Sequence, residues 1–228
     1  ARSRDYLVSY TAQSDTQRIV NYVSSQGRRS IVAFLPNNAE GALREQVLRQ
    51  EAIRTGITVN TVKYEVSQQG VLQAVEQAST DAQVSDTIYI PDGGAIPATI
   101  LTGLKDVGVA IETKQLIGSG KWETLRKEET VLQNALYPGR DITRFNQFAT
   151  RYQARFGEPA GVNAALAYDA VTFASELVRQ NGTNAFATNN IESSRGFQGT
   201  NGLFRILSNG ITQRSLAIYR IQGGEAVL

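Results

Sequence analysis

The stretch SIVAFL at residues 30–35 decides the fold class of this 228-residue chain. It is a short, continuous apolar run rich in β-branched and aromatic side chains, which is typical of a strand buried on both faces of a sheet. After the turn at 36–38 the apolar residues are spaced as on one face of a helix, as Ala42, Leu43 and Val47 show. A buried strand followed by a turn and a helix predicts an α/β domain.

The strand–turn–helix pattern recurs along the first 136 residues. A helix ahead of the first strand starts with Ser14 and Gln17, which have the spacing of a capping box. Consecutive strands linked through helices predict right-handed crossovers and a parallel sheet flanked by helices. The predicted strands are residues 31–35, 57–65, 87–90 and 114–117, and the helices between them are residues 39–55, 70–79 and 97–107.

The order of elements changes after residue 137. Asp141 is placed to cap a helix that ends at Gly157, and a second helix is predicted over residues 163–180. Its apolar residues are expected to point inward: Leu166, Ala170, Val171, Ala174, Leu177 and Val178. A polar loop covers residues 183–200. Strands are then predicted at 203–207, 216–221 and 226–228, and glycine turns join them into a C-terminal β-hairpin.

The composition excludes several classes of site. The chain has no Cys and no His, which excludes disulfides, Ser-His-Asp triads and nearly all transition-metal sites. We therefore predict no catalytic residue, no metal site and no cofactor. With 23 basic and 21 acidic residues, the chain lacks the basic excess typical of nucleic-acid binders. No apolar run reaches the ~20 residues of a transmembrane segment.

Polar residues follow the predicted strands at the points where they end. The carboxyl ends of parallel strands meet at one edge of a sheet, which is where ligands bind in α/β proteins. Short polar side chains, both signs of charge and one aromatic together suit a small polar ligand. The predicted ligand-binding residues are Asn37, Asn38, Glu40, Asp92, Gly93, Ser119, Lys121 and Trp122.

Some of these residues allow more than one interpretation. Trp122, the only tryptophan, either stacks on a ligand or packs between the lobes. Glu40, Asp92 and Glu123 each follow a predicted strand. Two of these carboxylates could act as acid and base, as in glycosidases, or they could bind an amine or a sugar hydroxyl without chemistry. The loop 118–120 lacks the third glycine of a dinucleotide fingerprint. Binding is therefore the favoured interpretation.

The helical region and the tail resemble a known family. The run FNQFATRYQARFGEP at 145–159, followed by ALAYDAV at 165–171, is similar to the type I periplasmic binding proteins, which include the branched-chain amino acid binding proteins of ABC transporters. The segment GFQGTNGLFR at 196–205 resembles the closing hairpin of that family. With GSGKW at 118–122, the chain is most similar to the branch of penicillin-binding protein activators.

The resemblance implies a two-lobed fold of which this chain covers a part. Residues 12–136 and 192–228 would form the second lobe, and residues 137–182 a helical return segment that packs on the first lobe. The chain starts at Ala1 and holds no Met, so we expect a processed protein or a fragment that lacks most of the N-terminal lobe. Amino acid binders of the family carry Tyr-Gly after the first strand of this lobe, whereas this chain has Glu40-Gly41.

The resemblance also implies a function. It predicts a non-catalytic binding protein in the periplasm or cell envelope of a Gram-negative bacterium, which captures an amino acid or another small polar solute for an ABC permease. The alternative is a lipoprotein of the activator type, whose partner is a peptidoglycan synthase. A carboxylate-based hydrolase is the third hypothesis, and it requires two carboxylates that converge in one site.

Overall fold

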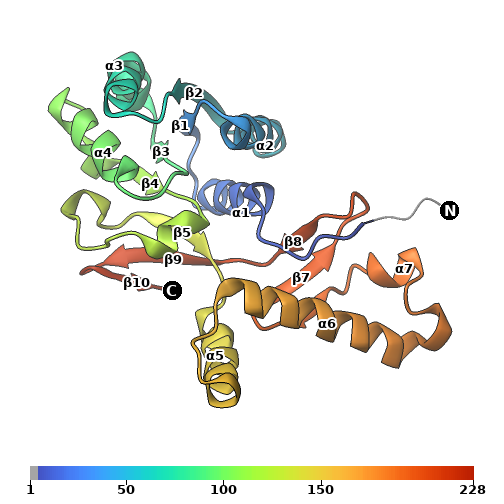
Figure 1. Cartoon of the computed structure of the whole chain (residues 1–228). Helices are drawn as coiled ribbons and strands as arrows, with labels where there is room; N and C mark the ends of the chain where they lie inside the picture. Colours follow the sequence, from blue (N-terminus) through green and yellow to red (C-terminus); the bar gives the residue numbers. More distant parts are fainter. Residues whose placement is uncertain (1–4) are drawn as a thin grey trace. The chain divides into compact units, whose positions relative to one another are not determined.

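The computed structural model describes residues 5–228, and the chain divides into two compact units. Unit 1 comprises the described residues up to Ser14 together with Arg140–Ala217. Unit 2 comprises Asp15–Gly139 together with Ile218–Leu228. The chain therefore crosses between the units three times, and the sheet of each unit is visible in Figure 1.

Unit 2 is built on a seven-stranded sheet with the strand order β10-β9-β5-β4-β3-β1-β2. Neighbouring strands from β2 across to β5 pair in parallel, which confirms the predicted parallel α/β sheet. The antiparallel β9–β10 pair matches the last two strands of the predicted C-terminal hairpin, whereas the predicted strand at 203–207 lies in the other sheet. The strands are β1 (Ser30–Pro36), β2 (Thr58–Tyr64), β3 (Thr87–Tyr89), β4 (Gln115–Ile117), β5 (Leu136–Gly139), β9 (Ala217–Gln222) and β10 (Glu225–Val227).

The fifth strand was not predicted from the sequence. β5 has the sequence Leu-Tyr-Pro-Gly and pairs with β4 through Ile117 and Leu136. Proline and glycine are depleted in strands, and four residues are too few to show a period. The strand exists because β4 and β9 flank it on both sides.

Helices cover both faces of this sheet (Figure 1). α1 (Ala12–Ser25) and α2 (Ala39–Thr55) lie on one face, and α3 (Gln68–Val84) and α4 (Ile96–Asp106) lie on the other. Successive side chains of a strand point to opposite faces of the sheet. Because β1 is apolar at every position from Ile31 to Leu35, it contributes to the hydrophobic core on both faces. On the first face Ile31, Ala33 and Leu35 pack in one cluster with Ile19, Val20 and Val23 of α1 and Leu48 of α2.

The start of α1 differs from its prediction. The helix begins at Ala12, so Ser14 lies inside the first turn rather than at the cap. The hydroxyl of Thr11 accepts the Ser14 N–H at 3.1 Å, which is the capping contact, and the Ser14 hydroxyl donates to the Thr212 carbonyl at 3.2 Å. Gln17 donates to Glu51 instead of closing a capping box. Thr11, three residues before Ser14, therefore fills the N-cap position that the spacing assigned to Ser14.

Unit 1 contains the predicted helical pair and a small antiparallel sheet. Its helices are α5 (Ile142–Phe156), α6 (Val162–Asn181) and the short α7 (Thr188–Ile191), and its strands β6 (Phe197–Gly199), β7 (Gly202–Ile206) and β8 (Thr212–Arg214) pair in the order β6-β7-β8. Asp141 caps α5 by accepting the Arg144 N–H at 3.1 Å, as predicted. Residues 192–217 thus lie in unit 1, while Ile218–Leu228 lie in unit 2. The assignment of 192–228 to a single second lobe remains a prediction.

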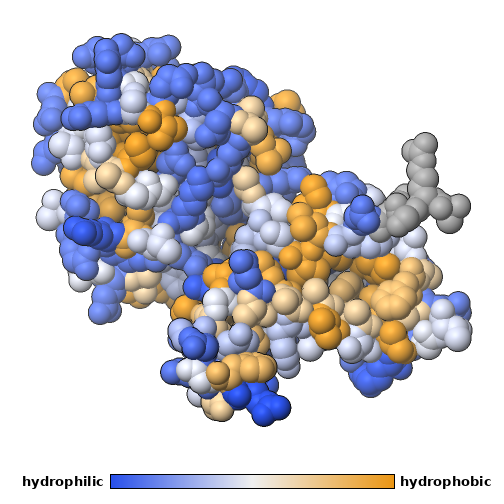
Figure 2. Space-filling model, in the orientation of Figure 1, coloured by the Kyte–Doolittle hydropathy of each residue, from blue (hydrophilic) through white to orange (hydrophobic). Residues whose placement is uncertain are grey.

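The apolar face of α6 is only partly buried. Leu177 and Ala165 are buried, but Val171 is 66% exposed and Val178 is 48% exposed. The expectation that both valines point inward is therefore wrong for the described chain. Figure 2 shows apolar surface gathered over the α6 and α7 part of unit 1, where Phe186 is exposed as well. A helix that is apolar on two opposite sides has a second face suited to packing.

Candidate functional site

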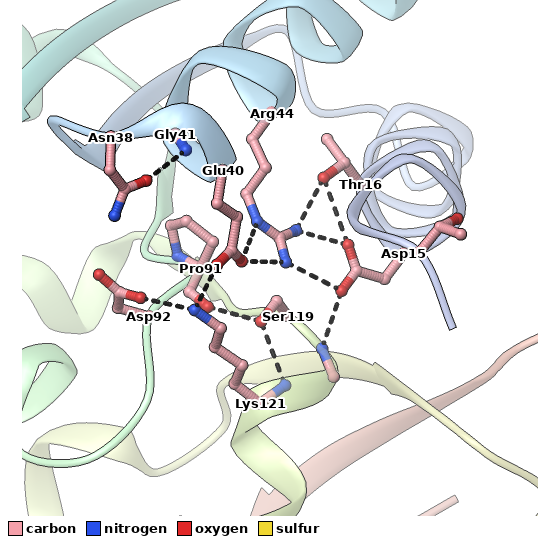
Figure 3. Close-up of polar contacts among 12 residues, drawn as sticks. Asp15, Thr16, Asn38, Glu40, Gly41, Arg44, Pro91, Asp92, Ser119 and Lys121 are labelled. Carbon is pink, nitrogen blue, oxygen red and sulfur yellow. Dashed lines mark hydrogen bonds and ion pairs between the residues drawn. The ribbon is translucent and has the colours of Figure 1, made fainter. Parts of the chain in front are cut away.

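Three of the predicted site residues meet at the carboxyl edge of the unit 2 sheet (Figure 3). Lys121 Nζ lies 2.8 Å from Glu40 Oε2 and 2.9 Å from Asp92 Oδ1, so one ammonium group joins two carboxylates. Glu40 follows β1 in the first turn of α2, Asp92 follows β3, and Lys121 follows β4 in the 3₁₀ helix η2 (Gly120–Thr124). Parallel strands place these three loops on the same edge.

A buried arginine lies beneath this exposed group. Arg44, one turn after Glu40 on α2, is 3% exposed and holds the Glu40 carboxylate through Nε at 3.1 Å and Nη2 at 3.0 Å. On its other side it binds both carboxylate oxygens of Asp15, at 2.5 and 3.3 Å. Charges of alternating sign therefore connect Asp15, Arg44, Glu40, Lys121 and Asp92, and we call these five residues the rim network.

Neighbouring polar groups anchor the rim network at both ends. Arg44 Nη1 also donates to the hydroxyls of Thr16 and Tyr89, each at 3.0 Å. Asp15 Oδ2 accepts the backbone N–H of Gly120, at 3.2 Å. At the far end the Tyr64 hydroxyl donates to Asp92. Hydrogen bonds on every side fix the buried charges, as buried ionic groups require.

The network keeps its exposed charges ionised. Burial alone would raise the pKa of Glu40, but the Lys121 ammonium and the Arg44 guanidinium hold it below its ordinary value. Burial alone would lower the pKa of Lys121, and its contacts with Glu40 and Asp92 raise it instead. Burial raises the pKa of Tyr89 to about 12, so its hydroxyl stays a neutral partner of Arg44. Both signs of charge therefore persist at this edge through the physiological pH range.

The lowered pKa of Glu40 predicts a pH-dependent contribution to stability. A carboxyl whose pKa is lower in the folded than in the unfolded state stabilises the fold above its unfolded value, and the contribution is lost as the pH falls through the folded value. We expect wild type to exceed Glu40→Gln in free energy of unfolding at pH 7 by up to about 1 kcal/mol, since solvent screens this partly exposed pair. Urea unfolding from pH 7 to 3 should show the difference shrinking; a difference that grows on acidification would contradict it.

The remaining predicted residues lie in the same loops but have structural roles. The Asn38 side chain caps α2 by accepting the Gly41 N–H at 3.0 Å. The Asn37 side chain donates to Glu65 at 2.6 Å. Ser119 is buried and donates to the Pro91 carbonyl, and Gly93 lies beside Lys121, since a Cβ there would be 3.4 Å from the Lys121 Cβ. These four residues shape the edge, and both asparagines remain exposed on it.

Trp122 does not offer a stacking face. Its side chain is 0% exposed, and its indole N–H donates to the Asp92 carbonyl at 2.9 Å. The ring covers Gly118 so closely that a Cβ at that position would lie 2.1 Å from it. The hypothesis that Trp122 stacks on a ligand is therefore wrong for this structure, and the ring packs within unit 2. Tryptophan here ties the loop after β4 to the loop after β3.

Sequence reasoning missed the buried half of the network. Asp15 precedes β1 on the first helix, and Arg44 looks like an ordinary solvated residue of an amphipathic helix. One signal was present, because Glu40 and Arg44 have the i, i+4 spacing of a helical ion pair. Asp15 gave no comparable signal, since its contact with Arg44 spans 29 residues. Glu123, the third candidate carboxylate, lies near Gly139 rather than beside Glu40 or Asp92.

The arrangement suits binding more than metal coordination or acid–base chemistry. Within residues 5–228, no group of three or more acidic side chains is placed to hold a metal ion. The two carboxylates that converge, those of Glu40 and Asp92, share a lysine cation. A general acid of the glycosidase type needs a carboxyl whose pKa is raised, and that of Glu40 is lowered.

Comparison with known proteins shows the fold. No protein-family model matches the chain, and no curated protein is significantly similar in sequence. Among solved structures, a putative branched-chain amino acid ABC transporter protein from Rhodospirillum rubrum matches 98% of the chain at 16% identity with a TM-score of 0.77. A branched-chain amino acid ABC transporter periplasmic ligand-binding protein from Burkholderia xenovorans matches 98% at 20% identity with a TM-score of 0.73.

A third similar structure is an ABC transporter solute-binding protein from R. palustris in complex with benzoate, which matches 97% of the chain at 12% identity with a TM-score of 0.66. The chain spans 67%, 64% and 63% of the length of these three solved chains, respectively. It therefore has the fold of the type I periplasmic binding proteins over nearly all of its length and matches about two thirds of theirs.

Proposed function

We propose that this chain, with its type I periplasmic-binding-protein fold, is part of a non-catalytic receptor that captures a small polar solute for an ABC-type uptake system. The observation that carries the proposal is the rim network at the carboxyl edge of the sheet. Its outer members present both signs of charge to solvent, because Lys121 is 41% and Glu40 34% exposed at the side chain. Ligands of open α/β sheets bind at this edge.

The pattern of charges favours a solute that carries both an ammonium and a carboxylate group. An incoming ammonium fits between Glu40 and Asp92, where the Lys121 ammonium lies in the described chain. The displaced Lys121 then pairs with the carboxylate of the solute. Arg44 holds Glu40 from below, so the carboxylate is already oriented, and preorganisation of this kind reduces the cost of binding.

The ligands of similar proteins agree with the carboxylate half of this class. Two of the three similar structures are named for branched-chain amino acids, and the third holds benzoate. All of these solutes carry a carboxylate, which Lys121 is placed to pair with. We propose an amino acid or a comparable small polar solute, an ABC permease as partner, and a location in the periplasm or cell envelope of a Gram-negative bacterium. Among the described residues, no helix has the length and apolar character needed to cross a membrane.

A second candidate function is regulation of a peptidoglycan synthase by an activator of the lipoprotein type. One observation favours it: every charge of the rim network already has a partner within the chain. A solute must displace an existing ion pair, and the Tyr of the amino acid binders is replaced by Glu40. An activator would use its outer surface and leave this edge internally neutralised.

We also propose that the helical return segment, residues 137–182, packs on the first lobe of the complete protein. Ala167, Val171 and Val178 form an exposed stripe along α6. This stripe lies on the side of the helix opposite the buried Ala165 and Asp169. In a two-lobed protein of this fold, a first lobe would cover that stripe. The stripe is exposed in the described chain, which supports the proposed role of residues 137–182.

Two experiments test the proposed function. Native mass spectrometry of the protein purified from its source should reveal a co-purifying molecule of low mass. Isothermal titration with that molecule should then show that Asp92→Ala and Lys121→Met each weaken binding by about 1 kcal/mol or more, as loss of a charged hydrogen bond would. Lys114→Met is the matched control, because Lys114 precedes β4 and its ammonium donates to the Gln83 carbonyl, outside the rim network.

The result separates the two candidate functions. If both rim variants bind the solute as tightly as wild type while the protein stays folded, this edge is not the site and receptor function at the rim is wrong. If no solute co-purifies or binds, but the protein binds a purified peptidoglycan synthase, the activator function replaces it. Weakening by Lys114→Met to the same extent would show a non-specific effect of charge.

A further inference from the structure

Unit 1 contains a cavity that the rim network does not involve. It has a volume of about 260 Å³ and lies between α5, α6 and β6. From α5 it is lined by Arg144, Gln147 and Arg151, which recur at i, i+3 and i+7 and so share one helical face. Tyr168 of α6 and Phe197 and Gln198 of β6 also line it.

The cavity carries an excess of positive charge. Arg151 is exposed and forms no ion pair with any residue in the described range 5–228. Among the described residues Arg144 pairs with one carboxylate, that of Asp141, through Nε at 3.4 Å. When the Gln198 amide is turned so that its oxygen faces Arg144, this oxygen also accepts from Nε at 3.3 Å. The two terminal amino groups of Arg144 pair with no carboxylate in the described range. The Asp141 carboxylate also caps α5, and it is therefore held at the helix start rather than turned into the cavity.

The one carboxylate at the floor is already satisfied. Asp169 is fully buried and accepts the N–H and the hydroxyl of Thr200, at 2.6 and 2.8 Å, and the Asn201 amide at 3.3 Å. The buried Arg214 guanidinium lies behind it at 3.9 Å. Because this charge is compensated from below, Asp169 does not neutralise the two arginines of α5.

The walls also offer a flat apolar surface. Tyr168 is half exposed, and its ring lies 5.1 Å from that of Phe148 in a tilted pair, which fixes its orientation. Phe197 is held between Phe173 and Phe204, with ring centroids at 5.4 and 5.5 Å. Gln147 and Gln198 add amide groups. Guanidinium groups beside amides and ring faces form a site for an anion that has a flat body.

We propose that this cavity is a second binding site, specific for a small organic carboxylate with a planar ring. The carboxylate pairs with Arg151 and the terminal amino groups of Arg144, which match its geometry through parallel N–H donors. The ring lies against Tyr168 and Phe197. The site is independent of the rim network, because all its residues lie in unit 1 and those of the rim network lie in unit 2.

The test is a titration of the whole chain with benzoate, followed by amide chemical shifts in two-dimensional NMR. Benzoate should shift the signals of Gly199 and Thr200, which line the cavity, in a saturable way. Arg151→Gln should weaken this binding at least fivefold. Arg155→Gln is the matched control, because Arg155 lies one turn further along α5 and does not line the cavity; it should change the affinity less than twofold.

Two further probes define the ligand class. Benzamide, with the same ring but no charge, and inorganic phosphate, with charge but no ring, should each bind at least fivefold more weakly than benzoate. Absence of saturable shifts at Gly199 and Thr200 would overturn the proposal, and so would equal losses in Arg151→Gln and Arg155→Gln. If Lys121→Met abolishes benzoate binding while Arg151→Gln leaves it intact, the anion binds at the rim network and the second site does not exist.

Discussion

Arg44→Ala is expected to lower the free energy of unfolding by about 3–5 kcal/mol, the range measured when one partner of a buried ion pair is removed. The substitution deletes a guanidinium that is 3% exposed and binds Asp15, Glu40, Thr16 and Tyr89 at once. The Asp15 carboxylate would remain largely buried without its cation. Urea unfolding followed by circular dichroism measures the loss.

Two variants make this prediction specific. Arg49→Ala removes an exposed arginine of the same helix, whose partner is Glu45 at 2.7 Å, and should cost less than about 1 kcal/mol. The double variant Asp15→Asn with Arg44→Met removes both buried charges and should be more stable than Arg44→Met alone, because no carboxylate is left uncompensated. A cost for Arg44→Ala no larger than that of Arg49→Ala would contradict the structural role of Arg44.

Trp122→Ala is expected to have an effect of similar size, about 3–5 kcal/mol, which is typical of truncating a large buried aromatic. The side chain is completely buried over Gly118, and its N–H is bound to the Asp92 carbonyl. Its removal leaves a cavity between the loops after β3 and β4 and loosens Asp92. Circular dichroism is the appropriate probe, because the variant contains no tryptophan for fluorescence.

Trp122→Phe separates packing from the hydrogen bond. It keeps a ring over Gly118 and loses the N–H donor, so we expect a cost of about 1–3 kcal/mol for the unsatisfied Asp92 carbonyl and the smaller ring. In wild type, tryptophan fluorescence should resist quenching by iodide, because the indole is inaccessible. Ready quenching, or a cost below about 1 kcal/mol for Trp122→Ala, would return Trp122 to the role of an exposed ligand contact.

The sequence by itself determined the parallel α/β core of unit 2, from β1 to β4. The run from Ile31 to Leu35 is apolar at every position, which only a strand covered on both faces permits, and the helical spacing behind it supplied the cover. The positions of Glu40, Asp92 and Lys121 followed from the same local pattern. Each lies within four residues of the end of a strand, and parallel strands bring such residues to one edge whatever the details of packing.

Only the tertiary structure decided how those residues act. Asp15 and Arg44 meet across 29 residues of sequence, and no local period records a contact of that kind. Trp122 had two equally reasonable interpretations, and the absence of a side chain at Gly118 decided for burial. β5 forms because its neighbours offer hydrogen-bond partners on both sides, which overrides the weak strand propensity of Leu-Tyr-Pro-Gly. Period and propensity are local quantities, whereas burial and ion pairing depend on which distant segments the fold brings together.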